Sequence, residues 1–195
     1  MKQKVLIIGG GEVFKSFDDF IEFQKSYDPG DIFDKDKIGW KENLKKDLKE
    51  FNVKRLYMPS SDNSKYFLWK FRFDNFLKYI SGEELILVGH SLGGIFLLKY
   101  LSENDVKFKI KQLHIVGSPY IKDYLLDFNF DEKKVAKLNS NKIFLYHSKD
   151  DKIVDVESFY KYKELLTNSK YFLFEDKGHF LEESFDELKE NILNY

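Results

Sequence analysis

The sequence has no cysteine and only three prolines among its 195 residues. Without cysteine, neither a disulfide framework nor a zinc site built from thiolates is possible. Long apolar runs are absent too, since no stretch approaches the roughly 18 residues of a membrane-spanning helix. The apolar run from Val5 to Ile8 is too short for a signal peptide. We therefore expect a cytoplasmic protein without a membrane span.

The chain also lacks an excess of charge of one sign. Lys and Arg total 32 and Asp and Glu total 33, so the formal net charge is −1. This balance gives no electrostatic reason to expect binding to nucleic acid or to an anionic membrane. The histidines and carboxylates show no tight ligand spacing such as His-x-x-x-His, so we expect no metal site.

Short aliphatic runs alternate along the chain with longer amphipathic runs, which is typical of a parallel β-sheet with crossover helices. No repeat or linker divides the chain, so we expect one doubly wound α/β domain over residues 1–195. The predicted strands lie at about 4–8, 54–58, 84–88, 111–116, 142–147 and 170–174. The predicted helices lie at about 16–26, 40–51, 66–81, 92–103, 155–167 and 182–194.

Two segments, 12–39 and 119–140, do not fit this alternation neatly. In an open α/β sheet, the loops that follow the carboxyl ends of strands surround the binding crevice. We expect each segment to be either an ordinary packed surface segment or a wall or lid of that crevice.

The sequence Gly-His-Ser-Leu-Gly-Gly at 89–94 lies between an apolar run at 84–88 and a helix-like run at 95–101. A serine at the tip of a tight turn between a strand and a helix is the layout of a nucleophile elbow. Glycines at 89 and 93 suit such a turn, because a side chain at either position would collide across it. The pattern alone also fits an ordinary glycine-rich turn, but the flanking strand and helix favour Ser91 as a nucleophile.

A serine nucleophile needs a base to take its proton and an acid to orient that base. His90 lies within the turn itself, and His114 and His147 fall inside predicted strands, where packed and hydrogen-bonded histidines are common. His179 follows the last predicted strand and precedes the last predicted helix. This position fits the chain order serine, acid, base, so His179 is the predicted base.

The acid is expected after the penultimate strand, where Asp150 and Asp151 are adjacent. Adjacent side chains point in different directions, so we do not expect both to reach His179. The spacing alone leaves the choice between them open. Asp155 fits better as the N-cap of the following helix.

Acyl transfer also requires two backbone N–H donors for the developing oxyanion. The Leu92 N–H follows the nucleophile, and the second donor is expected after the first strand, at Gly11 or alternatively at Gly10. The same glycines could instead serve only to turn the chain. They do not form a dinucleotide-binding loop, because Phe14 stands where the third glycine is needed.

Several further segments carry a family resemblance. They are Gly39-Trp40, Tyr57-Met58-Pro59, Trp69, the turn at 89–94, Ser148-Lys149-Asp150-Asp151, Gly178-His179-Phe180 and Phe185-Asp186-Glu187-Leu188. From about residue 39 onward the chain resembles the small serine hydrolases of the α/β-hydrolase superfamily, which include the retinoblastoma-binding serine hydrolase and the bacterial YdeN-like proteins. The resemblance implies a reduced three-layer sandwich of about six parallel strands with helices on both faces.

The resemblance also implies esterase-type activity without a cofactor, and Asp151 rather than Asp150 as the acid. The chain departs from the family pattern in two places. Asp155 stands where a proline commonly ends the aspartate loop, and the segment from Glu12 to Ile38 looks longer than the corresponding family loop. The first departure leaves the predicted acid in place, and the second concerns access to the site.

Two functional hypotheses follow. The first is a carboxylic ester hydrolase that uses Ser91, Asp151 and His179 on a small acyl substrate, with Tyr120 and Phe14 among the aromatic residues that line the acyl pocket. The second is a protein-binding module on a hydrolase scaffold, in which the three residues are idle and an aromatic surface binds a protein partner. Turnover of small esters distinguishes the two.

Overall fold

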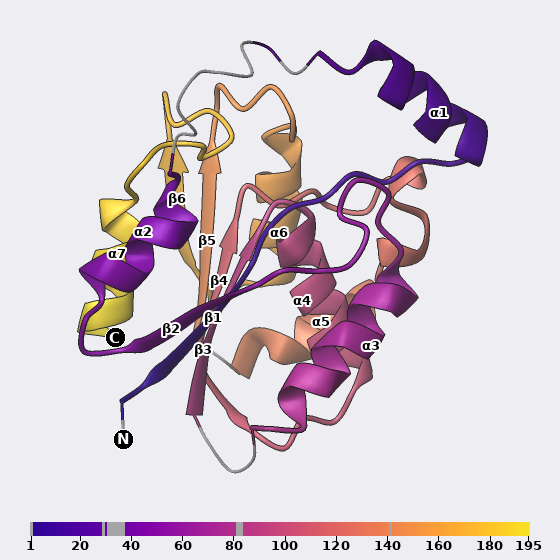
Figure 1. Cartoon of the computed structure of the whole chain (residues 1–195). Coiled ribbons are helices and arrows are strands. Elements are labelled where there is room, and N and C mark those ends of the chain that lie inside the picture. The colour runs from indigo at the N-terminus through magenta and orange to yellow at the C-terminus, as the bar shows by residue number, and fades with distance from the viewer. Residues whose placement is uncertain (1, 29, 31–37, 81–83, 141) are drawn as a thin grey trace.

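A parallel β-sheet forms the centre of the molecule. The computed structural model describes residues 2–28, 30, 38–80, 84–140 and 142–195. All six strands are parallel and lie in the order β2-β1-β3-β4-β5-β6 (Figure 1), which confirms the predicted α/β class. Their bounds are β1 Lys4–Ile8, β2 Asn52–Leu56, β3 Glu84–His90, β4 Lys109–Val116, β5 Ile143–Ser148 and β6 Lys170–Phe174.

Helices cover both faces of this sheet, as predicted (Figure 1). One face carries α2 and α7, and the other carries α3, α4 and α6. Among the described residues, no helix is long and apolar enough to cross a bilayer. The helix bounds are α2 Trp40–Asp47, α3 Tyr66–Leu77, α4 Leu92–Glu103, α6 Glu157–Leu165 and α7 Asp186–Asn194.

The central strands are buried on both sides. In β1, Val5 and Ile7 join the core beneath α2 and α7, whereas Leu6 and Ile8 join the core beneath α3 and α4. A strand whose two faces are both covered needs apolar side chains at consecutive positions. This explains the continuous aliphatic runs of the sequence.

The two irregular segments contain short helices. In the first, α1 (Phe17–Ser26) begins at a capping box between Ser16 and Asp19 and buries no side chain. It lies apart from the sheet in Figure 1. Residues 29 and 31–37 of this segment lie outside the described residues. The second segment forms η1 (Asp123–Phe128), α5 (Glu132–Val135) and η2 (Ala136–Ser140).

Some predicted boundaries were wrong by a few residues. Strand β2 begins at Asn52 rather than 54, and α2 ends at Asp47 rather than 51. Leu48 leaves the helical conformation with φ −102° and ψ 60° and places its buried side chain in the core. Tertiary packing therefore ends α2 earlier than the amphipathic pattern suggests.

The strand order brings two turns together. β1 lies between β2 and β3, so the chain leaves β1 toward one side of the sheet and reaches β3 on the other. Ligand crevices in open α/β sheets form at such a switch point, outside the carboxyl ends of the strands. Ile8 pairs with Gly89, so the glycine turn after β1 and the serine turn after β3 emerge side by side.

Candidate active site

Ser91 occupies a strained turn between β3 and α4. Its backbone has φ 54° and ψ −127°, a conformation that side-chain-bearing residues rarely adopt. A Cβ on Gly89 would lie 2.6 Å from the Gly94 Cα, and one on Gly93 would lie 2.6 Å from the Gly9 carbonyl oxygen. Only glycine fits at these two positions, as the sequence predicted.

The turn after β1 lies directly beside Ser91. A Cβ on Gly10 would lie 3.3 Å from Ser91 Oγ. The turn is held by the Glu12 N–H, which donates to the Ser61 carbonyl at 2.7 Å, and by the Glu12 carbonyl, which accepts from the Ser64 N–H at 2.7 Å. Gly11 and Leu92 line one cavity together with Ser91.

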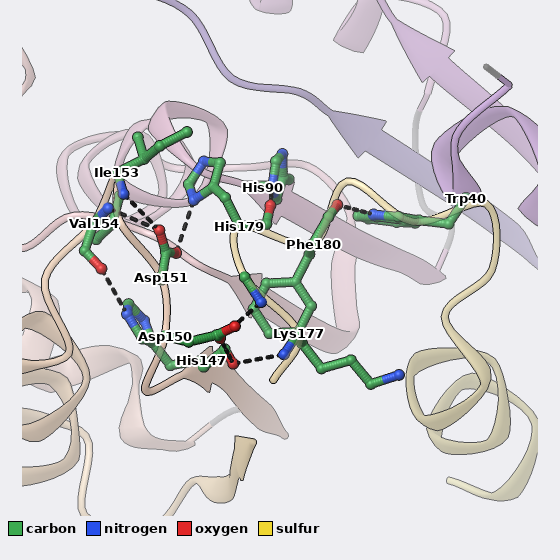
Figure 2. Close-up of polar contacts among 12 residues, drawn as sticks. Trp40, His90, His147, Asp150, Asp151, Ile153, Val154, Lys177, His179 and Phe180 are labelled. Carbon is green, nitrogen blue, oxygen red and sulfur yellow. Dashed lines mark hydrogen bonds and ion pairs between the residues drawn. The ribbon is translucent and has the colours of Figure 1, made fainter. Parts of the chain in front are cut away.

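His179 and Asp151 are hydrogen-bonded to each other (Figure 2). The distance between His179 Nδ1 and Asp151 Oδ2 is 2.8 Å, and both side chains are buried. The other Asp151 oxygen accepts the N–H groups of Ile153 at 2.9 Å and Val154 at 3.0 Å. Burial alone would raise the pKa of Asp151, but the hydrogen bonds from His179 and the two N–H groups outweigh it and lower that pKa. Asp151 is thus held as a carboxylate against the imidazole.

Asp150 points to a different part of the same loop. Its carboxylate accepts the Ser148 hydroxyl at 2.5 Å and the Gly178 N–H at 2.8 Å, and the Ser148 hydroxyl oxygen in turn accepts the Lys177 N–H at 2.8 Å. The hydrogen bond from Ser148 lowers the pKa of Asp150. The structure brings Asp151, not Asp150, to the imidazole of His179. Asp150 instead holds the backbone that leads into His179.

Two residues whose contacts the sequence did not reveal hold the other side of this loop (Figure 2). His90 Nε2 lies 2.9 Å from the His179 carbonyl oxygen, and the Trp40 indole N–H donates to the Phe180 carbonyl at 2.9 Å. Burial lowers the pKa of His90 well below its ordinary value, so the ring is neutral. A neutral His90 can donate its Nε2–H to the His179 carbonyl. Its Nδ1 then accepts a hydrogen bond from the Lys41 ammonium at 3.2 Å.

The remaining histidines are packed in the interior, as expected from their places in strands. His114 stacks on Phe144 with ring centroids 4.5 Å apart, and its nitrogens contact Tyr146 Oη and Gln112 Oε1. Burial lowers the pKa of His114 to about 3. His147 Nε2 lies 3.0 Å from the Val154 carbonyl oxygen. Neither side chain is available to Ser91.

Two cavities meet at Ser91. The first, about 200 Å³, is called the apolar cavity after Val13, Leu92, Pro119, Leu125, Ile153 and Val154 in its lining. Glu12, Gly11 and Tyr124 line it as well. The second, about 420 Å³, is called the cationic cavity after Lys41 and Arg55 in its lining. His179, the glycines 10 and 11, and the acids Glu12 and Asp62 line it as well. Ser91 and His179 both line the cationic cavity, although no hydrogen bond joins their side chains in the described residues. Such bonds are often long before a substrate binds.

The aromatic residues predicted to line the pocket lie elsewhere. Tyr120 is buried against Phe130 and Tyr162 and donates its hydroxyl to Glu132 at 2.5 Å. Phe14 packs against the aromatic rings of α1. Neither residue lines the two cavities at Ser91, because one ring folds into the core and the other is covered by α1. The wall of the apolar cavity is instead formed by aliphatic residues with Tyr124 and Glu12.

Solved structures with this architecture are numerous. The ydeN gene product of B. subtilis is similar at a TM-score of 0.72 and 18% identity, covering 99% of this chain and 98% of that chain. The chain has the α/β-hydrolase fold. A putative YdeN-like hydrolase from Pectobacterium atrosepticum aligns at a TM-score of 0.62 and 13% identity over 91% of this chain and 80% of its own. A meta-cleavage product hydrolase from Pseudomonas fluorescens aligns at a TM-score of 0.69 and 13% identity. The alignment covers 98% of this chain and 89% of that chain.

No protein-family model matches the sequence, and no curated protein matches it significantly. At 13 to 18% identity, the structural neighbours establish the fold alone. The chemistry must therefore be argued from the residues at the carboxyl edge of the sheet.

Proposed function

We propose that this α/β-hydrolase fold protein is a serine hydrolase that cleaves carboxylic esters of small acyl substrates through an acyl-enzyme. Ser91 Oγ attacks the acyl carbon while His179 Nε2 takes its proton, and His179 then protonates the departing alkoxide. A water molecule, deprotonated by the same nitrogen, attacks the acyl-enzyme and releases the acid and Ser91. Each proton taken by His179 is thus returned within the cycle.

Asp151 fixes the imidazole tautomer. Its carboxylate accepts the Nδ1–H of His179, which leaves Nε2 free as the base, and it stabilises the imidazolium that forms after proton transfer. The observation that carries the proposal is the 2.8 Å bond between His179 and Asp151 in a loop whose histidine lines one cavity with Ser91.

The oxyanion is assigned to the N–H groups of Leu92 and Gly11. Leu92 is the first residue of α4, so its N–H has no partner within the helix. The helix N-terminus also favours negative charge at this position. Gly11 N–H comes from the turn that lies against Ser91. Losing one such donor typically costs about 10²–10³ in kcat.

A fluorophosphonate probe tests the nucleophile. The wild type is expected to be labelled and to hydrolyse short p-nitrophenyl esters, and Ser91→Ala is expected to lose both activities. Ser102→Ala is the matched control, since Ser102 lies in the same helix, donates its hydroxyl to the Lys99 carbonyl and does not line either cavity at Ser91. Labelling that survives in Ser91→Ala would contradict the proposal. A wild type with no labelling and no turnover, but with a protein partner, would instead support the binding module.

A further inference from the structure

The two cavities at Ser91 differ in chemistry. An ester whose carbonyl carbon is bound at Ser91 extends in two directions, as the acyl chain and as the alcohol. The apolar cavity offers the side chains of Val13, Leu125 and Val154, among others, to a hydrocarbon group, and Glu12 in its wall disfavours a second anion there. The cationic cavity presents Lys41 and Arg55 beside the same serine. The two sides of the substrate therefore meet different environments.

Lys41 has no carboxylate partner among the described residues. Its ammonium lies 3.2 Å from His90 Nδ1 and 5.1 Å from the centre of the Trp40 ring, and both neighbours are neutral. Burial and the nearby Arg55 charge lower the pKa of Lys41 to about 8. Lys41 also lies in the first turn of α2, where the helix dipole disfavours a cation. An anion from the substrate would relieve all three penalties.

Arg55 supplies a second cation from the end of β2. Its guanidinium lies against the glycine turn, since a Cβ on Gly9 would be 3.4 Å from Arg55 Nη2. The guanidinium stacks over the Tyr57 ring at 4.8 Å and pairs with Glu42. Glu42 pairs with Arg55, and Lys41 has no such partner among the described residues, so these three side chains together carry a net positive charge.

Two acids limit the size of any anion at this position. Glu12 and Asp62 also line the cationic cavity, and neither forms an ion pair with Lys41 or Arg55 in the described part of the chain. They would repel a large polyanion such as a diphosphate. A single carboxylate carries less charge than a diphosphate and is repelled less by these two acids.

We propose that Lys41 and Arg55 form a carboxylate subsite, so that the preferred substrate is an ester with a carboxylate on one side of the scissile bond and an apolar group on the other. The proposal rests on the hydrolase function proposed above. It names a substrate class rather than a further reaction.

A matched pair of neutral and anionic esters tests the subsite. 3-Acetoxybenzoate and its methyl ester place a carboxylate or its neutral equivalent on the leaving group, and the p-nitrophenyl monoester of adipic acid and p-nitrophenyl hexanoate do so on the acyl chain. We expect kcat/KM for the anionic member of one pair to exceed that of its neutral partner by tenfold or more. The ratio of the two values is the readout.

Substitutions at the cations and at Glu42 are expected to change the ratio of anionic to neutral kcat/KM in opposite directions. Lys41→Gln and Arg55→Gln are expected to lower it about tenfold, mainly through KM. Glu42→Gln is expected to raise it, because Arg55 loses its competing carboxylate. Lys45→Gln on the same helix is the matched control, because Lys45 is exposed and does not line either cavity.

The outcomes separate the subsite from the hydrolase. If Ser91→Ala leaves hydrolysis of the neutral esters intact, the hydrolase proposal fails. If hydrolysis depends on Ser91 but Lys41→Gln slows both members of each pair equally, Lys41 acts only through His90 and the subsite is wrong. Competitive inhibition by inorganic phosphate but not by benzoate would overturn the choice of a carboxylate.

Discussion

At the scale of single residues, the adjacent aspartates Asp150 and Asp151 have different partners in the same loop. Residue order placed an acid after β5, but it could not choose between Asp150 and Asp151, because that choice depends on how the loop turns. In the structure, Asp151 faces the imidazole and Asp150 faces the backbone of 177 and 178. Ser91 and His179 were accessible to sequence reasoning because each follows its strand in a recognisable order.

The pair offers an isosteric test. Asp151→Asn removes the charge that orients and stabilises His179, and we expect kcat to fall about 10³- to 10⁴-fold. Asp150→Asn keeps an oxygen for the Gly178 N–H and is expected to lower kcat no more than about tenfold. Steady-state kinetics with p-nitrophenyl acetate measures both. A larger loss in Asp150→Asn than in Asp151→Asn would reverse the assignment of the two acids.

At the scale of elements, the segment of residues 177–180 after β6 is hydrogen-bonded to three parts of the fold. The end of β5 holds it through Ser148 and Asp150, β3 holds it through His90, and α2 holds it through Trp40. The sequence predicted these strands and helices, since each has its own apolar pattern. It did not reveal the contacts between them, because Trp40 and Phe180 are 140 residues apart along the chain.

Trp40→Phe tests whether α2 positions His179. The substitution keeps an aromatic ring in the core but removes the hydrogen bond to the Phe180 carbonyl. We expect kcat to fall about tenfold with little change in KM, because the histidine loses a support while the substrate cavities remain. Tyr171→Phe is the control, because it removes a similar hydrogen bond to the Leu166 carbonyl and neither residue lines a cavity at Ser91. Equal effects of the two variants on kcat would exclude a positioning role.

The irregular segment after β4 shows where composition misleads. Its aromatic residues suggested a pocket wall, yet Tyr120 and Phe128 are buried in the core beneath α3 and α4. Aromatic side chains bury large areas and dominate core energetics, so a rich cluster is as suited to packing as to binding. Whether such a side chain faces the core or the cavity depends on the path of the backbone. The local sequence pattern does not determine that path.

At the scale of the whole molecule, the buried histidines couple folding to pH. His90, His114 and His147 all have pKa values lowered by burial, so the folded protein resists protonation where the unfolded chain, with an ordinary pKa near 6.5, accepts protons. The unfolded state therefore binds more protons below pH 6.5. The contribution of these histidines to the free energy of unfolding must fall as the solution is acidified below that value, and it levels off above it.

His114→Gln measures the contribution of one buried histidine to this pH dependence. Between pH 6 and 5, each buried histidine contributes up to about 1.4 kcal/mol per pH unit to the slope of stability against pH. His114, with a pKa of about 3, stays neutral in the folded protein throughout this window. Removing it should reduce the slope by about that amount, whatever stability is lost through its stacking on Phe144. Urea unfolding of both proteins at pH 5, 6 and 7.5 gives the slopes. Parallel curves would mean that His114 is protonated in the folded state, which its buried position between Tyr146 and Gln112 argues against.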